Sequence, residues 1–174
     1  HECSGGMRQR VAIAIALLHR PSVIVADEPT TALDVSIQAQ ILAQMRDLAR
    51  ETGTAMVWIS HDLAVVYRLA RKLAVMYAGR IVEDGPTAAL LRSPRHPYPA
   101  GLIASLPAMA TPGAPLTQIA GSTPSLLSLP KGCPFAPRCM HASQRCTADP
   151  QIEQDGDRKL RCFHPVGMDD TVQA

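Results

Sequence analysis

Two adjacent carboxylates, Asp27 and Glu28, directly follow the apolar run Val23 to Ala26. Such a run predicts a short buried strand and places both carboxylates at its C-terminal edge, where open α/β sheets bind ligands. In phosphate-transfer sites the first carboxylate holds Mg²⁺ and the second orients or deprotonates the attacking water. We therefore assign Asp27 to a metal ion and Glu28 to water. The alternative is a solvated acidic pair in a loop.

A second candidate site is the run Ser4-Gly5-Gly6. It directly precedes the segment Arg8 to Arg20, which lacks Gly and Pro and predicts a helix that stops before Pro21. Unpaired amides and the positive end of a helix dipole bind anions, and glycine lets a phosphate approach the backbone closely. The alternative is a Gly-Gly loop without a ligand.

A third candidate is His61, which follows the predicted strand Ala55 to Ile59. If that strand lies beside Val23 to Ala26, the imidazole reaches the same sheet edge as Glu28 and can contact a terminal phosphate. The alternative is a polar residue at a turn, with Asp62 fixing its ring.

The elements that position these residues fall into two compositional blocks. Residues 1 to 85 alternate helix-like and strand-like segments, which is typical of a parallel sheet covered by helices. Asp34 or Ser36 caps a helix that Gly53 stops, and Asp62 caps another. The expected elements are a helix over 8–20, a strand over 23–26, a helix up to 53, a strand over 55–59, a helix up to 70 and a hairpin of 73–77 with 80–83.

Residues 86 to 174 form an appended, irregular module rich in Pro and Cys. They contain thirteen of the fifteen prolines and four of the five cysteines. We expect short helices over 86–91 and 98–106, and an irregular crossover from Pro107 to Pro130.

The overall composition excludes two classes of partner surface. The chain has 174 residues, 47% of them apolar, and a net charge of +2, with nine acidic and nine basic residues up to position 85. This balance offers no basic face for nucleic acid. The longest apolar run, Val11 to Leu18, is far shorter than the ~20 residues that span a bilayer.

Four ordered motifs in the first block together resemble the ABC transporter ATPase family. They are Ser-Gly-Gly-Met-Arg-Gln-Arg from Ser4, Val-Ile-Val-Ala-Asp-Glu-Pro-Thr from Val23, Thr31-Ala32-Leu33-Asp34 and Ser60-His61-Asp62. The resemblance implies a partial P-loop NTPase fold in which Ser4 to Met7 form the signature loop, Asp27-Glu28 the Walker B pair, Ala32 to Asp34 the D-loop and His61 the switch histidine. Cys3 stands where the family usually has Leu, which suggests looser packing.

The resemblance also implies a site shared between two subunits. Two ATPase domains enclose two nucleotides, so Ser4, Gly5, Gly6 and Met7 would bind the partner's ATP, and Asp34 would lie at the dimer interface. Asp27, Glu28 and His61 would act on the chain's own nucleotide. The phosphate-binding motif G-x-x-x-x-G-K-S/T is absent, since none of the three lysines follows a glycine. Because the chain begins at His1 inside a motif, we expect a C-terminal fragment.

The second block resembles the C-terminal extension of oligopeptide and dipeptide importer ATPases. The resemblance lies in Arg95-His96-Pro97-Tyr98, in Leu102 to Pro107, in Ile119 to Leu126 and in Gly132 to Cys139. Pro99 and Ala100 depart from the usual Thr-Arg after Pro-Tyr.

Four cysteines in this extension follow the spacing C-x5-C-x6-C-x15-C: Cys133, Cys139, Cys146 and Cys162. Four thiolates are a normal way to hold an iron-sulfur cluster, and some relatives carry a 4Fe-4S cluster. Zinc fits less well, because neither close pair has the usual C-x(2–4)-C spacing. Four free cysteines are the remaining alternative, since disulfides are disfavoured on the cytosolic side where an ATPase works.

The leading hypothesis is an ATPase subunit that uses ATP and Mg²⁺ to drive oligopeptide or dipeptide import. Its implied partners are a second ABC ATPase subunit, identical or paralogous, transmembrane permease subunits and, indirectly, a peptide-binding protein, but no nucleic acid. It would be peripheral, at the cytoplasmic face of the plasma (inner) membrane. The alternatives are a non-transport ABC ATPase, or a regulatory or metal-binding piece without activity. We expect this chain alone to lack ATPase activity, because two carboxylates repel a nucleotide unless Mg²⁺ intervenes.

Overall fold

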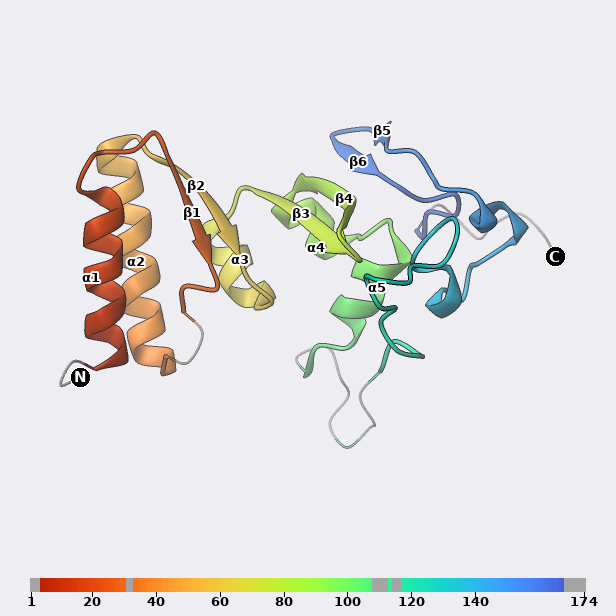
Figure 1. Ribbon diagram of the computed structural model, residues 1–174, viewed down its shortest axis with the longest axis horizontal. Helices are drawn as coiled ribbons and strands as arrows, with labels where there is room; N and C mark the ends of the chain where they lie inside the picture. Colours follow the sequence, from red (N-terminus) through yellow and green to blue (C-terminus); the bar gives the residue numbers. More distant parts are fainter. Residues whose placement is uncertain (1–3, 31–32, 108–112, 114–116, 168–174) are drawn as a thin grey trace. The chain divides into compact units, whose positions relative to one another are not determined.

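The computed structural model describes residues 4–30, 33–107, 113 and 117–167, and the chain divides into two compact units, His1–Ala70 and Arg71–Ala174 (Figure 1). No helix in these ranges is both long and apolar enough to cross a bilayer. The elements in chain order are α1 (Gly5–Leu17), β1 (Val23–Asp27), α2 (Val35–Thr52), β2 (Ala55–Ile59), α3 (Leu63–Leu69), β3 (Lys72–Tyr77), β4 (Arg80–Pro86), α4 (Thr87–Arg92), α5 (Pro97–Ala104), the 3-10 turns η2 (Ala136–Arg138) and η3 (Gln144–Thr147), β5 (Glu153–Asp155) and β6 (Arg158–Leu160).

The first unit contains a two-stranded parallel sheet of β1 and β2 (Figure 1). Its register pairs Val23 with Ala55 and Asp27 with Ile59, so both strands end at the same edge. Ile24 and Met56 converge with Leu17 of α1 and Met45 of α2 around a small apolar space. The order of elements, strand, helix and parallel strand, is the one that the alternation in the sequence predicts.

Local signals place the ends of two helices as expected. The Asp34 carboxylate accepts a hydrogen bond from the Ile37 amide at 2.9 Å and begins α2. Gly53 ends α2 with φ of 69°, a left-handed conformation that glycine adopts readily. Asp62 caps α3 by accepting from the amides of Ala64 and Val65.

One face of the first unit remains uncovered in the described residues. On the sheet face opposite α2, Val25 is 64% exposed and Val57 is 50% exposed. On α1, which buries no residue, the apolar side chains of Met7, Val11 and Ile15 recur every four residues and are all exposed. Extended apolar surface of this kind is typical of an interface.

The second unit contains a four-stranded antiparallel sheet in the order β3-β4-β6-β5. The predicted hairpin is confirmed: Ala78 and Gly79, with φ of 48° and 77°, turn β3 into β4. The pairing of β6 with β4, through Glu83 opposite Leu160, is absent from the sequence expectations. Strands of three residues with a mixed polar pattern carry no detectable period, so only the long-range pairing reveals them.

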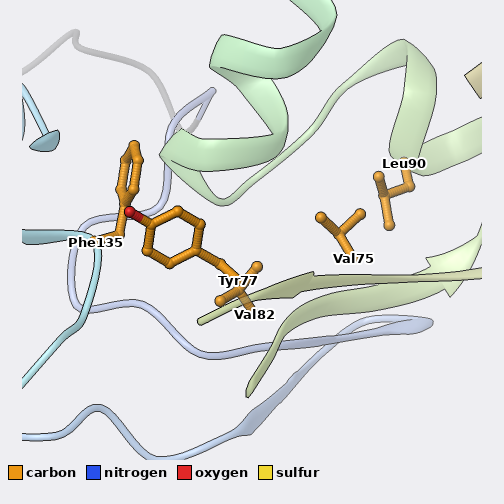
Figure 2. Packing of buried hydrophobic residues seen from close by; sticks show 5 residues of the cluster. All are labelled: Val75, Tyr77, Val82, Leu90 and Phe135. Atoms are coloured by element: carbon orange, nitrogen blue, oxygen red, sulfur yellow. The ribbon is translucent and has the colours of Figure 1, made fainter. Parts of the chain in front are cut away.

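The core of the second unit joins the hairpin to the appended module (Figure 2). Tyr77 packs edge-on against Phe135 with ring centroids 5.2 Å apart, and Phe135 is almost completely buried. The core cluster consists of Val75, Tyr77, Val82, Leu90 and Phe135. This core draws on both sides of residue 85, and the compact units divide at Ala70.

The predicted helices of the second unit are present at slightly shifted positions as α4 and α5. Within the expected crossover, residues 117–130 contain turns and no helix or strand, in agreement with their Pro-rich and Ser-rich composition.

Candidate functional site

Glu28 and His61 come together at the carboxyl ends of β1 and β2. The Nδ1 atom of His61 lies 2.7 Å from Oε1 of Glu28. The hydrogen bond that the ring donates to the Glu28 carboxylate is the larger cause, and the negative charge of Glu28 the smaller, of a His61 pKa raised above 6.5. Because the His61 side chain is 78% exposed, this contact orients the two groups more than it stabilises the fold. The conditional expectation about His61 is therefore confirmed in its geometry.

The backbone on both sides of this pair is held in place. Glu28 has a φ of 46°, which is unusual for a residue with a side chain, and its amide donates to the Ile59 carbonyl at 3.0 Å. On the other strand the Ser60 hydroxyl accepts from the Asp62 amide at 3.0 Å. Strained conformations persist where surrounding contacts determine them, and they cluster at functional sites.

Asp27 lies one residue before Glu28, opposite Ile59 in the register. The alternation of β1 places Asp27 on the same exposed face as Val23 and Val25. In the described ranges, no three His, Cys, Asp or Glu side chains are close enough to hold a single metal ion. The assignment of Asp27 to Mg²⁺ thus stays a prediction that relies on the nucleotide's phosphates as additional ligands.

Ser4 to Met7 form the first turn of α1 rather than a loop before it. The Ser4 hydroxyl caps the helix by accepting from the Met7 amide at 3.3 Å. The expectation that the helix begins at Arg8 is wrong: it begins at Gly5, because the Ser4 cap stabilises a first turn that contains two glycines. The amides of Gly5 and Gly6 therefore lie in the first turn, where helix N–H groups lack intrahelical acceptors.

The glycines of this turn also have a packing role. A Cβ atom on Gly6 would lie 2.7 Å from Cγ2 of Ile37 in α2, and one on Gly5 would lie 3.4 Å from Cδ2 of Leu33. The turn therefore packs against the start of α2, which Asp34 caps. Two hydrogen bonds, from the Ile37 amide and the Ser36 hydroxyl, lower the pKa of Asp34. Cys3, Thr31 and Ala32, the last of which was expected to begin the D-loop, lie outside the described residues.

The four cysteines of the extension line one small cavity that is partly open to solvent. All four are free thiols. His96, Phe135 and His164 line the same cavity. Residues from a stretch of almost seventy positions therefore meet at one place, which the cysteine spacing alone does not establish.

Gly132 brings two of these cysteines together. The Cys133 amide donates to the Cys146 carbonyl at 3.0 Å. A Cβ atom on Gly132 would lie only 2.3 Å from that carbonyl oxygen, and Gly132 has a φ of 81°. Only glycine fits this close approach of two backbone segments.

Amide groups point at the cysteine sulfurs, an arrangement that stabilises thiolates. The His164 amide donates to Sγ of Cys162 at 3.3 Å. The amides of Phe135 and Ala136 are directed at the Cys133 sulfur, and that of His141 at the Cys139 sulfur. Burial is nevertheless the larger effect: it raises the pKa of the Cys133 and Cys139 thiols and that of Cys162 to about 11. Without a metal these three thiols are protonated at neutral pH, and a positive group in the cavity would favour their ionised form.

Four cysteines line one cavity, but no three potential ligands among the described residues are placed to hold a metal ion. The assignment of these cysteines to an iron-sulfur cluster thus stays a prediction.

The family models match both parts of the chain. Residues 1–31 match the ABC transporter model, and residues 82–146 match the oligopeptide/dipeptide transporter C-terminal region. By these matches the chain is similar to ABC transporter ATPases in its first part and to oligopeptide/dipeptide transporters in its second.

The particular branch follows from the curated relatives. The chain is 52% identical over 167 residues to the oligopeptide transport ATP-binding protein OppD of Salmonella typhimurium, an alignment that covers 95% of this chain and 50% of the relative. It is 51% identical to OppD of Escherichia coli, with the same coverage, and 48% identical to the probable D,D-dipeptide transport ATP-binding protein DdpD of that organism, covering 92% of this chain and 49% of the relative. It corresponds to the C-terminal part of an OppD-like oligopeptide transport ATP-binding protein.

The chain spans about half the length of the curated relatives it matches. Among solved structures, a dimeric post-hydrolysis state of an ATP-binding cassette bound to ADP and Pi is 34% identical, with a TM-score of 0.45, over 49% of this chain and 37% of that one.

Sequence reasoning singled out the phosphate-site residues but missed His96 and Gly132. His96 lies within Arg95 to Tyr98 and lines a cavity that forms between distant segments, so no local pattern reveals its position.

Proposed function

We propose that the protein containing this chain is an ATP-hydrolysing subunit that energises the import of oligopeptides or dipeptides. The observation that carries this proposal is the 2.7 Å contact between His61 and Glu28 in a chain that also carries the oligopeptide/dipeptide transporter C-terminal region. The first feature supports hydrolysis of the terminal phosphoanhydride bond of ATP, and the second supports the class of transported substrate.

In this proposal Asp27 holds Mg²⁺, and Glu28 orients and deprotonates the attacking water. His61 fixes the Glu28 carboxylate through Nδ1, which leaves Nε2 as the ring nitrogen for the terminal phosphate. The raised pKa of His61 keeps the ring proton available at that contact. Each of these roles uses an atom at the carboxyl edge of β1 and β2.

The first turn of α1 would act on the nucleotide of a second ATPase subunit. The amides of Gly5 and Gly6 and the positive end of the helix supply an anion site, with Ser4 and Met7 beside it. Since this turn packs on the start of α2, a change at the Asp34 end of α2 would be felt at the turn. ATP that binds at the shared interface would stabilise the closed dimer, and hydrolysis would remove that stabilisation.

The proposed partners are an identical or paralogous ATPase subunit and transmembrane permease subunits, with a peptide-binding protein acting indirectly. The subunit would lie at the cytoplasmic face of the inner membrane as a peripheral component. The 174-residue chain by itself contains no G-x-x-x-x-G-K-S/T motif, so we expect it alone to show no ATP hydrolysis above a buffer blank.

For the extension we propose that Cys133, Cys139, Cys146 and Cys162 hold a 4Fe-4S cluster. The shared cavity and the amides directed at three of the sulfurs support it. When bound, such a cluster supplies one-electron redox capacity and cross-links the segments that carry the cysteines. Anaerobic purification with iron and sulfide assays should find about four of each per chain; an iron-free protein would contradict the cluster.

The hydrolysis proposal is tested by Glu28→Gln in the protein with its complete ATPase domain, reconstituted with permease subunits in liposomes. The variant should bind ATP as the parent does but hydrolyse it at least ~100-fold more slowly and import no peptide, since general-base catalysis contributes about that factor. Glu51→Gln, an exposed carboxylate near the end of α2, is the matched control and should keep full activity. Undiminished turnover in Glu28→Gln would refute the role of Glu28, and hydrolysis without peptide import in the parent would refute the transport assignment.

A further inference from the structure

Two neighbouring residues in the first turn of α2 contact both parts of the candidate phosphate site, and all of these contacts lie within the first unit. Ile37 lies against the turn that opens α1, since a Cβ atom on Gly6 would be 2.7 Å from its Cγ2 atom. Gln38 lies beside the segment that carries the histidine, and its Nε2 atom donates to Oδ2 of Asp62 at 3.5 Å. Because a helix turns by about 100° per residue, adjacent side chains can face two different neighbours.

Asp62 connects Gln38 to the histidine that precedes it. One oxygen of the Asp62 carboxylate caps α3, and the other accepts from Gln38. The Asp62 amide donates to the Ser60 hydroxyl at 3.0 Å, so side-chain contacts hold the backbone on both sides of His61. The His61 side chain is 78% exposed, so packing does little to orient it and the position of its backbone matters more.

The first turn of α2 is braced so that Ile37 and Gln38 move together. The Asp34 carboxylate accepts from the Ile37 amide at 2.9 Å and from the Ser36 hydroxyl at 2.7 Å. The Gln38 amide donates to the Asp34 carbonyl at 2.8 Å. Typical N–H···O bonds are about 2.9 Å long, so the side-chain bond of Gln38 at 3.5 Å is near its limit. A small displacement of this turn would therefore shorten or break it.

We propose that Gln38 is a positioning residue that couples the two nucleotide sites in which this chain takes part. A nucleotide at the first turn of α1 presses on Ile37, the first turn of α2 shifts, and the bond from Gln38 to Asp62 shortens. The shortened bond holds His61 in place beside Glu28, so that occupancy of the partner's site favours hydrolysis at the chain's own site. This inference rests on the ATPase function proposed above.

Two substitutions of Gln38 test the coupling in the protein with its complete ATPase domain, reconstituted with permease subunits in liposomes. Gln38→Met keeps an unbranched side chain that favours helix but has no donor, whereas Gln38→Arg again donates to the Asp62 carboxylate. Gln44→Met makes the same exchange at an exposed position further along α2 and is the matched control. Hydrolysis measured against ATP concentration gives the turnover and the Hill coefficient.

We expect the parent and Gln44→Met to hydrolyse ATP cooperatively. In Gln38→Met the turnover at saturating ATP should fall about fivefold and the Hill coefficient to about 1, because the link between the sites is cut. Gln38→Arg should recover both quantities. A role of Gln38 in stability alone would lower the melting temperature and leave the Hill coefficient unchanged.

The outcomes separate this inference from the ATPase function on which it rests. Unchanged turnover and cooperativity in Gln38→Met would overturn the coupling, as would equal losses in Gln38→Met and Gln38→Arg or a parent that hydrolyses ATP without cooperativity. A parent that hydrolyses no ATP would refute the ATPase function itself.

Ile37→Ala tests the other end of the same path, because it removes the Cγ2 atom that lies against Gly6. It should lower the Hill coefficient as Gln38→Met does. Since the two residues act in series, the double variant should turn over no more slowly than the slower single variant, and multiplied losses would contradict a single path. If Gln38→Met does not fold, unchanged cooperativity in Ile37→Ala overturns the coupling.

Discussion

The close approach at Gly132 gives a prediction whose size follows from the structure. An alanine at this position would adopt a left-handed conformation, at about 1–2 kcal/mol. Its Cβ would also lie 2.3 Å from the Cys146 oxygen and 2.5 Å from the Thr147 carbonyl carbon, both of which are backbone atoms. Displacing two backbone segments adds about 1–3 kcal/mol, so Gly132→Ala should destabilise the second unit by about 2–5 kcal/mol in total.

Gly156 provides a matched control in the same unit. Its φ of 62° is also left-handed, but a Cβ there would meet no atom within 4 Å. Gly156→Ala should therefore cost only the conformational part, about 1–2 kcal/mol.

Hydrogen-exchange mass spectrometry of peptides covering β3 and β4 measures the destabilisation in each variant as a lower free energy of opening. In Gly132→Ala alone, the Cys133 amide should also lose its protection. Equal losses of protection in the two variants would refute the argument from backbone approach.

Two further predictions concern charged groups. Since Glu28 raises the pKa of His61, an NMR titration should show this pKa falling toward 6.5 in Glu28→Gln, and an unchanged pKa would contradict the contact. By linkage, the contribution of the pair to stability is present below pH 6.5 and is lost as pH rises through the raised pKa. Glu83→Gln should lower the free energy of unfolding, measured by urea denaturation, by about 3 kcal/mol because it leaves the Arg158 guanidinium poorly paired. Glu153→Gln, at an exposed position, should change it by less than about 0.5 kcal/mol. Equal effects would contradict the pairing of Glu83 with Arg158.

Most of the first unit could be predicted because its signals are local. Asp34, Asp62 and Gly53 cap helices through contacts within three residues, and the pattern alone shows them. The pair of Glu28 and His61 required one further step, the rule that parallel neighbours end at the same edge. The start of α1 was misplaced because a Gly-Gly pair weakens a helix in isolation, and its packing against Ile37 is a tertiary contact.

The second unit was less predictable because its determinants lie far apart in the sequence. Gly132 faces residues 146 and 147, and Glu83 faces residue 158. Neither a glycine before a cysteine nor a glutamate in a strand indicates such a partner by its own type. The cavity lined by the four cysteines exists only once these distant segments have come together.

The pairing of β6 with β4 has a consequence for synthesis on the ribosome. The ribosome must translate about 70 further residues after β4 before it reaches β6, which takes roughly 4–15 s at the usual rate of elongation. During that interval Glu83 lacks the Arg158 guanidinium, and one edge of the β3–β4 hairpin is open to pairing with another nascent chain. Slow codons or pauses between these strands would prolong this exposure, so translation speed within the extension should influence the yield of folded protein.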